Sequence, residues 1–174
     1  MAAKTEQTRR RMPSFNDHAH EILPGIWLGD ALAASDDEWI LRNRISVIFN
    51  CTKDVPFAAK APCITQRYRL PVDDNLQASE IDNMAAWAAE AVMKAYYAWR
   101  AGNRLLIHCY AGRQRSAAIV AMLVILLLKK PMEDAMTFVR QKRPVAFFPA
   151  ANFARAIQKF ETDFLAATTA AIAK

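Results

Sequence analysis

Short apolar segments in the first two thirds of the chain predict strands. Residues 46–51 are β-branched and apolar, which is typical of a buried strand, and residues 64–70 and 104–108 predict two more. Residues 21–28 predict a short extended pair, broken by the turn dipeptide Pro24-Gly25. Predicted helices lie between or after these segments.

Helices are predicted where apolar residues recur at intervals of three and four. The longest covers residues 79–100, where Ser79 and Asp82 have the spacing of a capping box. Residues 115–130 are almost wholly apolar and predict a helix at the centre of the fold. Shorter helices are predicted over residues 35–44, with Ser35 as the cap, 131–142 and 152–170. Strands that alternate with helices, followed by helices alone, predict an α/β layered domain.

Charge and composition narrow the class of protein. The chain has 174 residues, 53% of them hydrophobic, which is enough for one domain with a real core. Residues 1–18 are predicted to be a flexible basic tail, and residues 19–174 to be the folded domain. The formal net charge of +6 favours anionic partners such as a phosphorylated protein, an anionic lipid or RNA.

The cysteines and the apolar runs bear on location. Three cysteines without metal-ligand spacing predict a reducing, intracellular setting, either cytoplasmic or nuclear. No apolar stretch in the first twenty residues resembles a secretory signal, and the longest apolar run, residues 117–128, is too short to cross a bilayer. We therefore expect no transmembrane segment.

The candidate chemistry lies in residues 105–116. An apolar strand leads to Cys109, and Arg115 follows six positions later, at the start of an apolar helix. A short loop between a strand and a helix turns successive backbone N–H groups inward and forms a nest for an oxyanion. Gly112 permits the torsions of such a loop. The predicted phosphate-binding residues are Tyr110, Ala111, Gly112, Arg113, Gln114 and Arg115.

Two side chains give this loop its expected reactivity. Arg115 offers a planar, two-pronged donor to two phosphate oxygens. Cys109 faces the positive potential of the arginine and of the helix start, which lowers the pKa of a thiol. A thiolate held there could attack phosphorus and form a phosphocysteine.

The segment resembles the signature of protein tyrosine phosphatases: His-Cys, five residues, Arg, then Ser or Thr. Its Ala111-Gly112 pair and Ser116 resemble the dual-specificity branch. The resemblance extends from about residue 21 to about residue 160, and includes residues 22–29, residues 47–52 and Arg143-Pro144. On this resemblance, the fold has a central, mostly parallel, twisted sheet of about five strands flanked by helices, and residues 19–174 form a dual-specificity phosphatase-like catalytic domain.

The resemblance also implies roles for single residues. His108 would help to set the ionisation of Cys109, and Ser116 would assist departure of the thiolate when the intermediate is hydrolysed. A carboxylic acid must protonate the leaving oxygen. The family takes an Asp that follows a strand and a proline, and residues 71–75 have this pattern here. We expect Asp74 to be the acid, with Asp73 as the alternative, and neither a metal nor a cofactor is implied.

The sequence departs from the family in three places. Gln114 replaces the usual serine before the signature arginine, which leaves the hydrogen bonding of the loop open. Arg113 adds a charge at the centre of the loop. The usual Pro-Asn-x-Gly-Phe appears as residues 149–153, Pro-Ala-Ala-Asn-Phe, so a late polar contact to the site is either missing or moved.

The implied activity is hydrolysis of phosphotyrosine and phosphoserine/threonine in proteins through a phosphocysteine intermediate. The same chemistry on a phosphoinositide or an RNA 5′-phosphate is an alternative, supported by the net charge of +6 and by Arg113. A non-catalytic phosphate-binding module is an alternative of another class, although the presence of Cys109, Arg115 and Asp74 argues against it. The chain could be a monomer or a homodimer.

Overall fold

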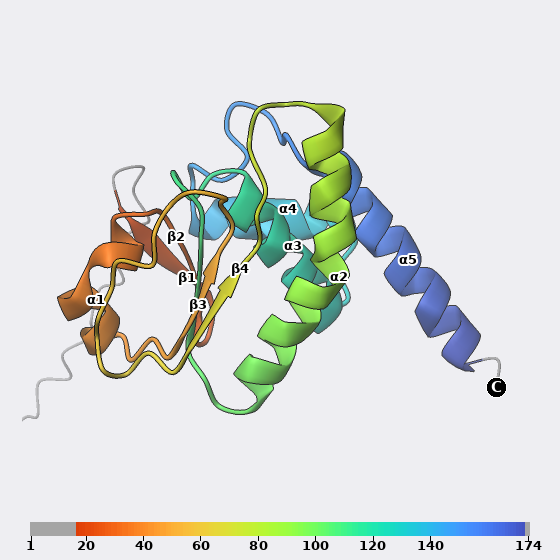
Figure 1. Cartoon of the computed structure of the whole chain (residues 1–174). Helices are drawn as coiled ribbons and strands as arrows, with labels where there is room; N and C mark the ends of the chain where they lie inside the picture. Colours follow the sequence, from red (N-terminus) through yellow and green to blue (C-terminus); the bar gives the residue numbers. More distant parts are fainter. Residues whose placement is uncertain (1–16, 173–174) are drawn as a thin grey trace, which may run out of the picture.

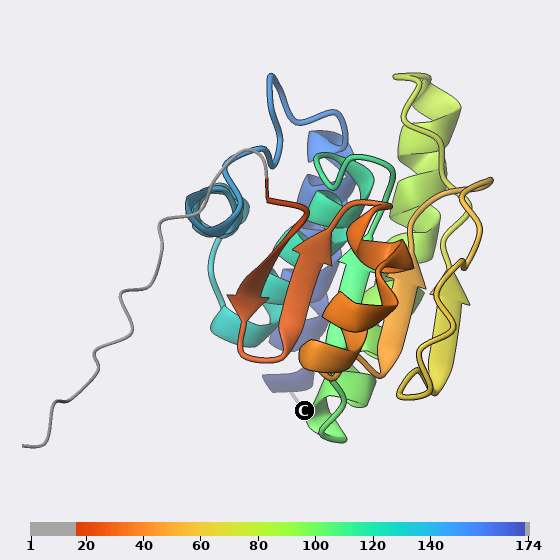
Figure 2. The same cartoon turned by 90° about the vertical axis from the view of Figure 1, so that its left-hand side faces the viewer.

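A five-stranded sheet forms the centre of the computed structural model, which describes residues 17–172 (Figures 1 and 2). The strand order is β1-β2-β5-β3-β4; β1 and β2 are antiparallel, and every other pairing is parallel. This arrangement confirms the predicted α/β fold with a mostly parallel sheet. The strands are β1 (Ala19–Leu23), β2 (Ile26–Gly29), β3 (Val47–Asn50), β4 (Gln66–Arg69) and β5 (Leu105–His108).

Because β5 is the central strand, the end of the signature strand lies in the middle of the sheet, at the carboxyl ends of the parallel strands. In the register of the sheet, His108 lies between Gly29 of β2 and Asn50 of β3. All four residues of β5 are buried, because helices cover both faces of the sheet there. The carboxyl ends of three parallel strands therefore meet where the Cys109 loop begins, which is the usual location of ligand sites in such sheets.

Helices cover the two faces of the sheet unequally. One face carries α2 (Ala78–Arg100), α3 (Arg115–Leu128), α4 (Met132–Lys142) and α5 (Ala154–Ile172), with α3 packed among the other three. The other face carries the 3-10 helix η1 (Ala33–Ser35) and the short α1 (Asp37–Arg42), visible in front of the sheet in Figure 2. Adjacent strand residues alternate between the two cores, as the side-chain period of two requires.

Two predicted helix caps are wrong. Asp36, not Ser35, caps α1, because its carboxylate accepts a hydrogen bond from the Trp39 N–H at 2.9 Å while the Ser35 hydroxyl donates to Leu32 O at 3.0 Å. Helix α2 begins at Ala78, after Gln77, without a side-chain cap, so Ser79 already lies inside the first turn.

The ends of two later helices also differ from the prediction. Helix α3 stops at Leu128 rather than at residue 130, because Lys129 adopts a left-handed conformation with φ of 54°. Helix α5 begins at Ala154, two residues after the predicted start. Its last turns project away from the body of the molecule (Figure 1).

The N-terminal prediction concerns residues that are almost all outside the described part of the chain. Residues 1–16 are not described, so the basic tail stays a prediction. Within the described part, His18 Nδ1 lies 2.8 Å from Asp30 Oδ2. No helix among residues 17–172 is both long and apolar enough to span a membrane.

Candidate active site

Contacts from outside the Cys109–Arg115 loop hold its carbonyl groups. Ala31 N donates to Tyr110 O at 3.0 Å, and Phe147 N donates to Arg113 O at 2.8 Å. The buried Arg143 donates through Nε to Gly112 O at 2.8 Å and through Nη2 to Ala111 O at 3.3 Å. Because these carbonyls point outward, the N–H groups of the same stretch are free to face the inside of the loop, as an oxyanion nest requires.

Gly112 is the one position of this loop where only glycine fits. Its φ of +62° is unfavourable for other residues, and a Cβ atom would lie 2.5 Å from Gly29 O and 2.6 Å from Arg143 Nη2. The loop therefore packs directly against the end of β2 and against the Arg143 guanidinium. The sequence alone assigns no role to Arg143, although the Arg143-Pro144 pair belongs to the family resemblance.

Cys109 lies at the floor of the loop and is almost fully buried. Burial by itself raises the pKa of its thiol, but the Arg115 charge lowers it, as do hydrogen bonds from the Ser116 hydroxyl and from the Ser116 and Arg113 N–H groups. The net pKa is below the ordinary value for cysteine. The Ser116 Oγ is 3.2 Å from Cys109 Sγ and donates a hydrogen bond to the sulfur. This environment favours the nucleophilic thiolate.

Arg115 connects the loop with the segment that carries Asp73 and Asp74. Its Nη1 donates to Val72 O at 3.1 Å, and its Nε is buried without a hydrogen-bond partner among the described residues. A buried donor without a partner is rare in folded proteins. An anion inside the loop would supply the missing acceptor.

The two candidate acids have different partners. Asp73 is paired with Lys53, with 3.0 Å between carboxylate and ammonium, and its N–H donates to Glu80 at 2.9 Å. Asp74 Oδ1 instead accepts a hydrogen bond from Asn152 Nδ2 at 2.7 Å. Asn152 belongs to the segment beside the Cys109 loop, so this geometry favours Asp74 as the residue that faces the site.

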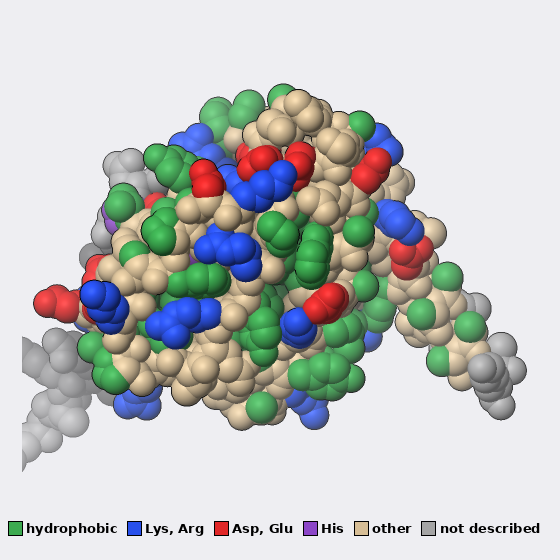
Figure 3. Space-filling view, viewed as in Figure 1, with side chains coloured by type: hydrophobic (Ala, Val, Ile, Leu, Met, Phe, Trp, Pro, Cys, Tyr) green, Lys and Arg blue, Asp and Glu red, His purple; other side chains and the backbone are tan. Residues whose placement is uncertain are grey.

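Charges on the α2 and β4 face are mixed. Figure 3 shows Lys and Arg side chains next to Asp and Glu side chains there, rather than a continuous basic surface. The Lys53 ion pairs with Asp73 and Glu80 are part of this pattern. Such a face lacks the uniform positive potential that nucleic-acid-binding surfaces present.

Comparisons with known proteins agree with this geometry. The family model described as "Dual specificity phosphatase, catalytic domain" matches residues 26–163. The chain belongs to the dual specificity phosphatase family. It is 29% identical to human dual specificity protein phosphatase 2, over 93% of this chain and 50% of that protein, and 30% identical to human dual specificity protein phosphatase 4, over 87% and 36%. The chain thus spans half or less of the length of these relatives.

Solved structures of family members have the same fold. Human DUSP28 superposes with a TM-score of 0.75 at 26% identity, covering 89% of this chain and 99% of that one. A mouse dual specificity phosphatase in complex with zinc tungstate superposes with a TM-score of 0.77 at 26% identity, covering 87% and 91%. PTPMT1, at 18% identity and a TM-score of 0.70, shares the fold.

His108 in this phosphatase domain is neutral at physiological pH. Burial lowers its pKa from 6.5 to about 4. Its Nδ1 is 3.1 Å from Cys109 O, and since a carbonyl only accepts, this nitrogen carries the proton. At neutral pH His108 therefore places no positive charge beside the sulfur, and its ring is hydrogen-bonded to the Cys109 peptide group instead.

The lowered pKa of His108 makes stability depend on pH. The unfolded chain takes up this proton as the pH falls through 6.5, whereas the folded protein takes it up only at about 4. The contribution of His108 to the free energy of unfolding should therefore be constant above pH 6.5. It should fall by roughly 3 kcal/mol between pH 6.5 and pH 4. Between pH 6.5 and pH 4, the free energy of unfolding of a His108→Asn variant should therefore fall by about that amount less than that of the wild type.

Urea unfolding of both proteins across this pH range measures the difference. His20, whose pKa is also lowered by burial, contributes equally to both proteins and cancels. Equal pH dependence of unfolding in the wild type and the variant would contradict a neutral, buried His108.

Gln114 and Asn152 supply the polar contacts that were in question at the family departures. The Gln114 side chain is only 5% exposed; its Nε2 donates to Ala150 O at 2.7 Å and to Phe148 O at 3.3 Å, and its Oε1 accepts from Asn152 N at 3.0 Å. The late polar contact is thus moved to Asn152 rather than missing. The sequence contained the signal, an asparagine in the departing motif, but not its partner.

The other predicted loop residues lie at the surface. Tyr110 is 70% exposed, and Ala111 and Arg113 are also exposed, so their side chains are free to contact a substrate beyond the phosphate. Their backbone groups remain the predicted anion ligands.

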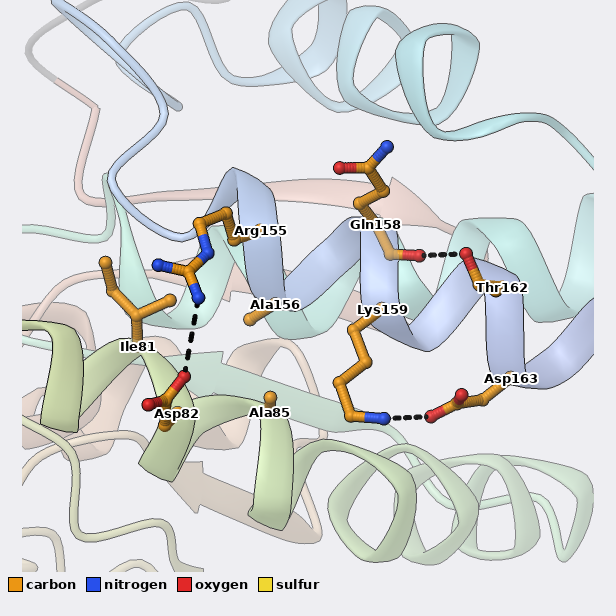
Figure 4. Close-up of a pocket in the computed structure, with 9 residues that line it drawn as sticks. All are labelled: Ile81, Asp82, Ala85, Arg155, Ala156, Gln158, Lys159, Thr162 and Asp163. Carbon is orange, nitrogen blue, oxygen red and sulfur yellow. Dashed lines mark hydrogen bonds and ion pairs between the residues drawn. The ribbon is translucent and has the colours of Figure 1, made fainter.

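A groove between α2 and α5 is separate from this site (Figure 4). Its charges are paired with one another: Arg155 with Asp82 at 3.8 Å, and Lys159 with Asp163 at 2.9 Å. No residue of the Cys109–Arg115 loop lines it. The groove therefore adds nothing to the phosphate chemistry.

Proposed function

We propose that this chain is a cysteine-dependent phosphatase that hydrolyses phosphotyrosine and phosphoserine/threonine in proteins. The observation that carries the proposal is Cys109, whose thiol pKa is lowered while it lies almost fully buried at the floor of a loop with outward carbonyls. A thiolate there, with Arg115 beside it, combines a nucleophile with an anion site. Family membership supports the same activity.

The proposed reaction has two steps. The Cys109 thiolate attacks phosphorus, the bond from phosphorus to the substrate oxygen breaks, and Asp74 gives its proton to that oxygen. Asp74 then takes a proton from water as the water attacks the phosphocysteine. The phosphorus–sulfur bond breaks, and Ser116, whose Oγ is 3.2 Å from the sulfur, stabilises the departing thiolate. Arg115 and the loop N–H groups stabilise the equatorial oxygens in both steps.

Protein substrates are favoured over the two other phosphate classes. The relatives that match over most of this chain are named as protein phosphatases. PTPMT1, also solved in complex with PI(5)P, is only 18% identical, so the likeness extends to the fold alone. The net charge of +6, which favoured a lipid or RNA substrate, includes four basic residues of the expected tail that lie outside the described residues. The face in Figure 3 is of mixed charge and therefore does not favour RNA.

Kinetics on three substrates test this preference. Phosphopeptide, phosphoinositide and triphosphorylated RNA, compared side by side, should give the highest kcat/KM for the phosphopeptide. A higher value for either of the others would replace the protein substrate. The cytoplasmic or nuclear location, and the choice between monomer and homodimer, stay predictions.

Separate substitutions of the two aspartates test the acid. Asp74→Asn should lower kcat on phenyl phosphate by about 10²- to 10³-fold, because the phenolate leaves poorly without a proton. Asp73→Asn, which removes a partner of Lys53, should stay within about threefold of the wild type, as expected for a surface pair. Steady-state rates decide between them, and the reverse order of effects would make Asp73 the acid.

A further inference from the structure

Gln114 differs from the family pattern and yet is one of the most fully bonded side chains at the site. A buried amide must satisfy its donors and its acceptor, and Gln114 uses both groups. All three of its side-chain bonds go to one segment, at Phe148, Ala150 and Asn152. Gln114 therefore fastens the segment 148–152 to the phosphate-binding loop.

The fastened segment holds the proposed general acid. The backbone of Asn152 is held in place, because its N–H donates a hydrogen bond to Gln114 Oε1 at 3.0 Å. Its side-chain Nδ2 then donates to Asp74 Oδ1 at 2.7 Å. Two consecutive hydrogen bonds thus join Gln114, which immediately precedes Arg115, to the carboxyl group that must approach the leaving oxygen.

Other contacts hold the backbone before Asp74, at Val72 and Asp73, but not the Asp74 side chain. Residues 74–79 are exposed, and Leu76 has a left-handed φ of 62°. The bond from Arg115 Nη1 to Val72 O holds the backbone two residues earlier, and does not orient the Asp74 side chain. The contact with Asn152 does orient it. Because the Asn152 amide donates to Oδ1, Oδ2 is the oxygen that would carry the acidic proton.

We propose that Gln114 is a positioning residue for the general acid Asp74 and acts through Asn152. The proposal rests on the function proposed above. It assigns to this side chain a role that couples the phosphate-binding loop to proton transfer. Neither Gln114 nor Asn152 needs to touch the reacting atoms for this role, so their effect should depend on how much the leaving oxygen needs a proton.

A leaving-group comparison tests the coupling. Phenyl phosphate requires a proton at its leaving oxygen, whereas 2,4-dinitrophenyl phosphate, with an acidic phenol, does not. Asn152→Ala should lower kcat on phenyl phosphate by about 10-fold and on the dinitrophenyl ester by less than about 2-fold. Gln114→Met, which keeps the length of the side chain but not its amide, should show the same selectivity, with about a 5-fold loss.

A double variant and a matched control complete the experiment. If the two residues act in one chain, Gln114→Met combined with Asn152→Ala should be no worse on phenyl phosphate than Asn152→Ala alone. Arg155→Ala changes an exposed residue in the first turn of α5 and should leave both rates unchanged. Thermal unfolding identifies variants that do not fold, and Asn152→Ala carries the test if Gln114→Met is one of them.

Each result supports or overturns the proposal. Selective loss on phenyl phosphate with non-additive effects supports it. Equal losses on both esters, no loss on either, or fully additive effects overturn it. Failure of the proposed function is detected separately, because the wild type would then hydrolyse neither ester. A wrong assignment of the acid is also detected separately, because Asp74→Asn, measured in the same series, would show no leaving-group selectivity.

Discussion

Cys109→Ser is expected to abolish turnover of a generic aryl phosphate, with a loss of at least about 10⁴-fold in kcat. A serine hydroxyl in the same position remains protonated at neutral pH, because the lowered pKa that makes the thiolate available belongs to the sulfur. The anion-binding loop depends on backbone groups and Arg115, so it should persist. Initial rates on phenyl phosphate measure the loss, and binding of tungstate or sulfate measures the retained loop.

A second cysteine provides the control. Cys63 is half-buried and its thiol donates to Ile45 O at 3.3 Å, far along the chain from the signature loop. Cys63→Ser should keep wild-type activity within about twofold. Activity of Cys109→Ser at the wild-type level would refute the assignment of the nucleophile. If the loop is retained, the same variant can capture phosphorylated proteins in a pull-down, which would identify the substrate.

Arg115→Lys is expected to lower kcat/KM by about 10³-fold, more than a charge-conserving change would suggest. The guanidinium presents two parallel donors to two phosphate oxygens, and an ammonium group cannot reproduce this geometry. Lysine also cannot replace both the Nη1 bond to Val72 O and the buried Nε donor. The segment with Asp74 should therefore lose one of its anchors.

The inhibition constant of tungstate, measured together with kcat/KM, separates the loss of phosphate binding from the loss of the anchor for the Asp74 segment. Tungstate should bind about 10-fold or more weakly to Arg115→Lys, because the lost donors also serve the ground-state anion. Arg100→Lys, an exposed arginine in the last turn of α2, is the matched control and should change neither value. Unchanged tungstate binding in Arg115→Lys would contradict the role of Arg115 as the phosphate clamp.

Local patterns in the chain were sufficient to predict most elements of the fold. Short apolar segments located all five strands, and apolar residues at intervals of three and four located the four long helices, each to within a few residues, because burial imposes these patterns on the sequence. Helix ends were predicted less well. The cap of α1 depends on which of two neighbouring oxygens reaches the Trp39 N–H, and composition does not distinguish Ser35 from Asp36.

The signature segment could likewise be recognised from the sequence, because its cysteine, glycine and arginine lie within seven consecutive residues. The choice between Asp73 and Asp74 could not be made from neighbouring residues alone. In the structure Lys53 pairs with Asp73 and Asn152 contacts Asp74, which favours Asp74 as the acid. Lys53 and Asn152 are separated from these partners by about 20 and 78 positions in the chain.

The amino-acid sequence alone therefore determined the strands and helices, the class of fold and the loop after Cys109. Each of these follows from residues that are close in the chain and from the periodicity of their apolar side chains. Folding decided the strand order, the burial of Arg143 against the loop and the contact from Gln114 through Asn152 to Asp74. The contacts of Arg143, Gln114 and Asn152 join residues more than 30 positions apart, and these contacts, like the strand order, depend on how the sheet and helices pack rather than on any local preference.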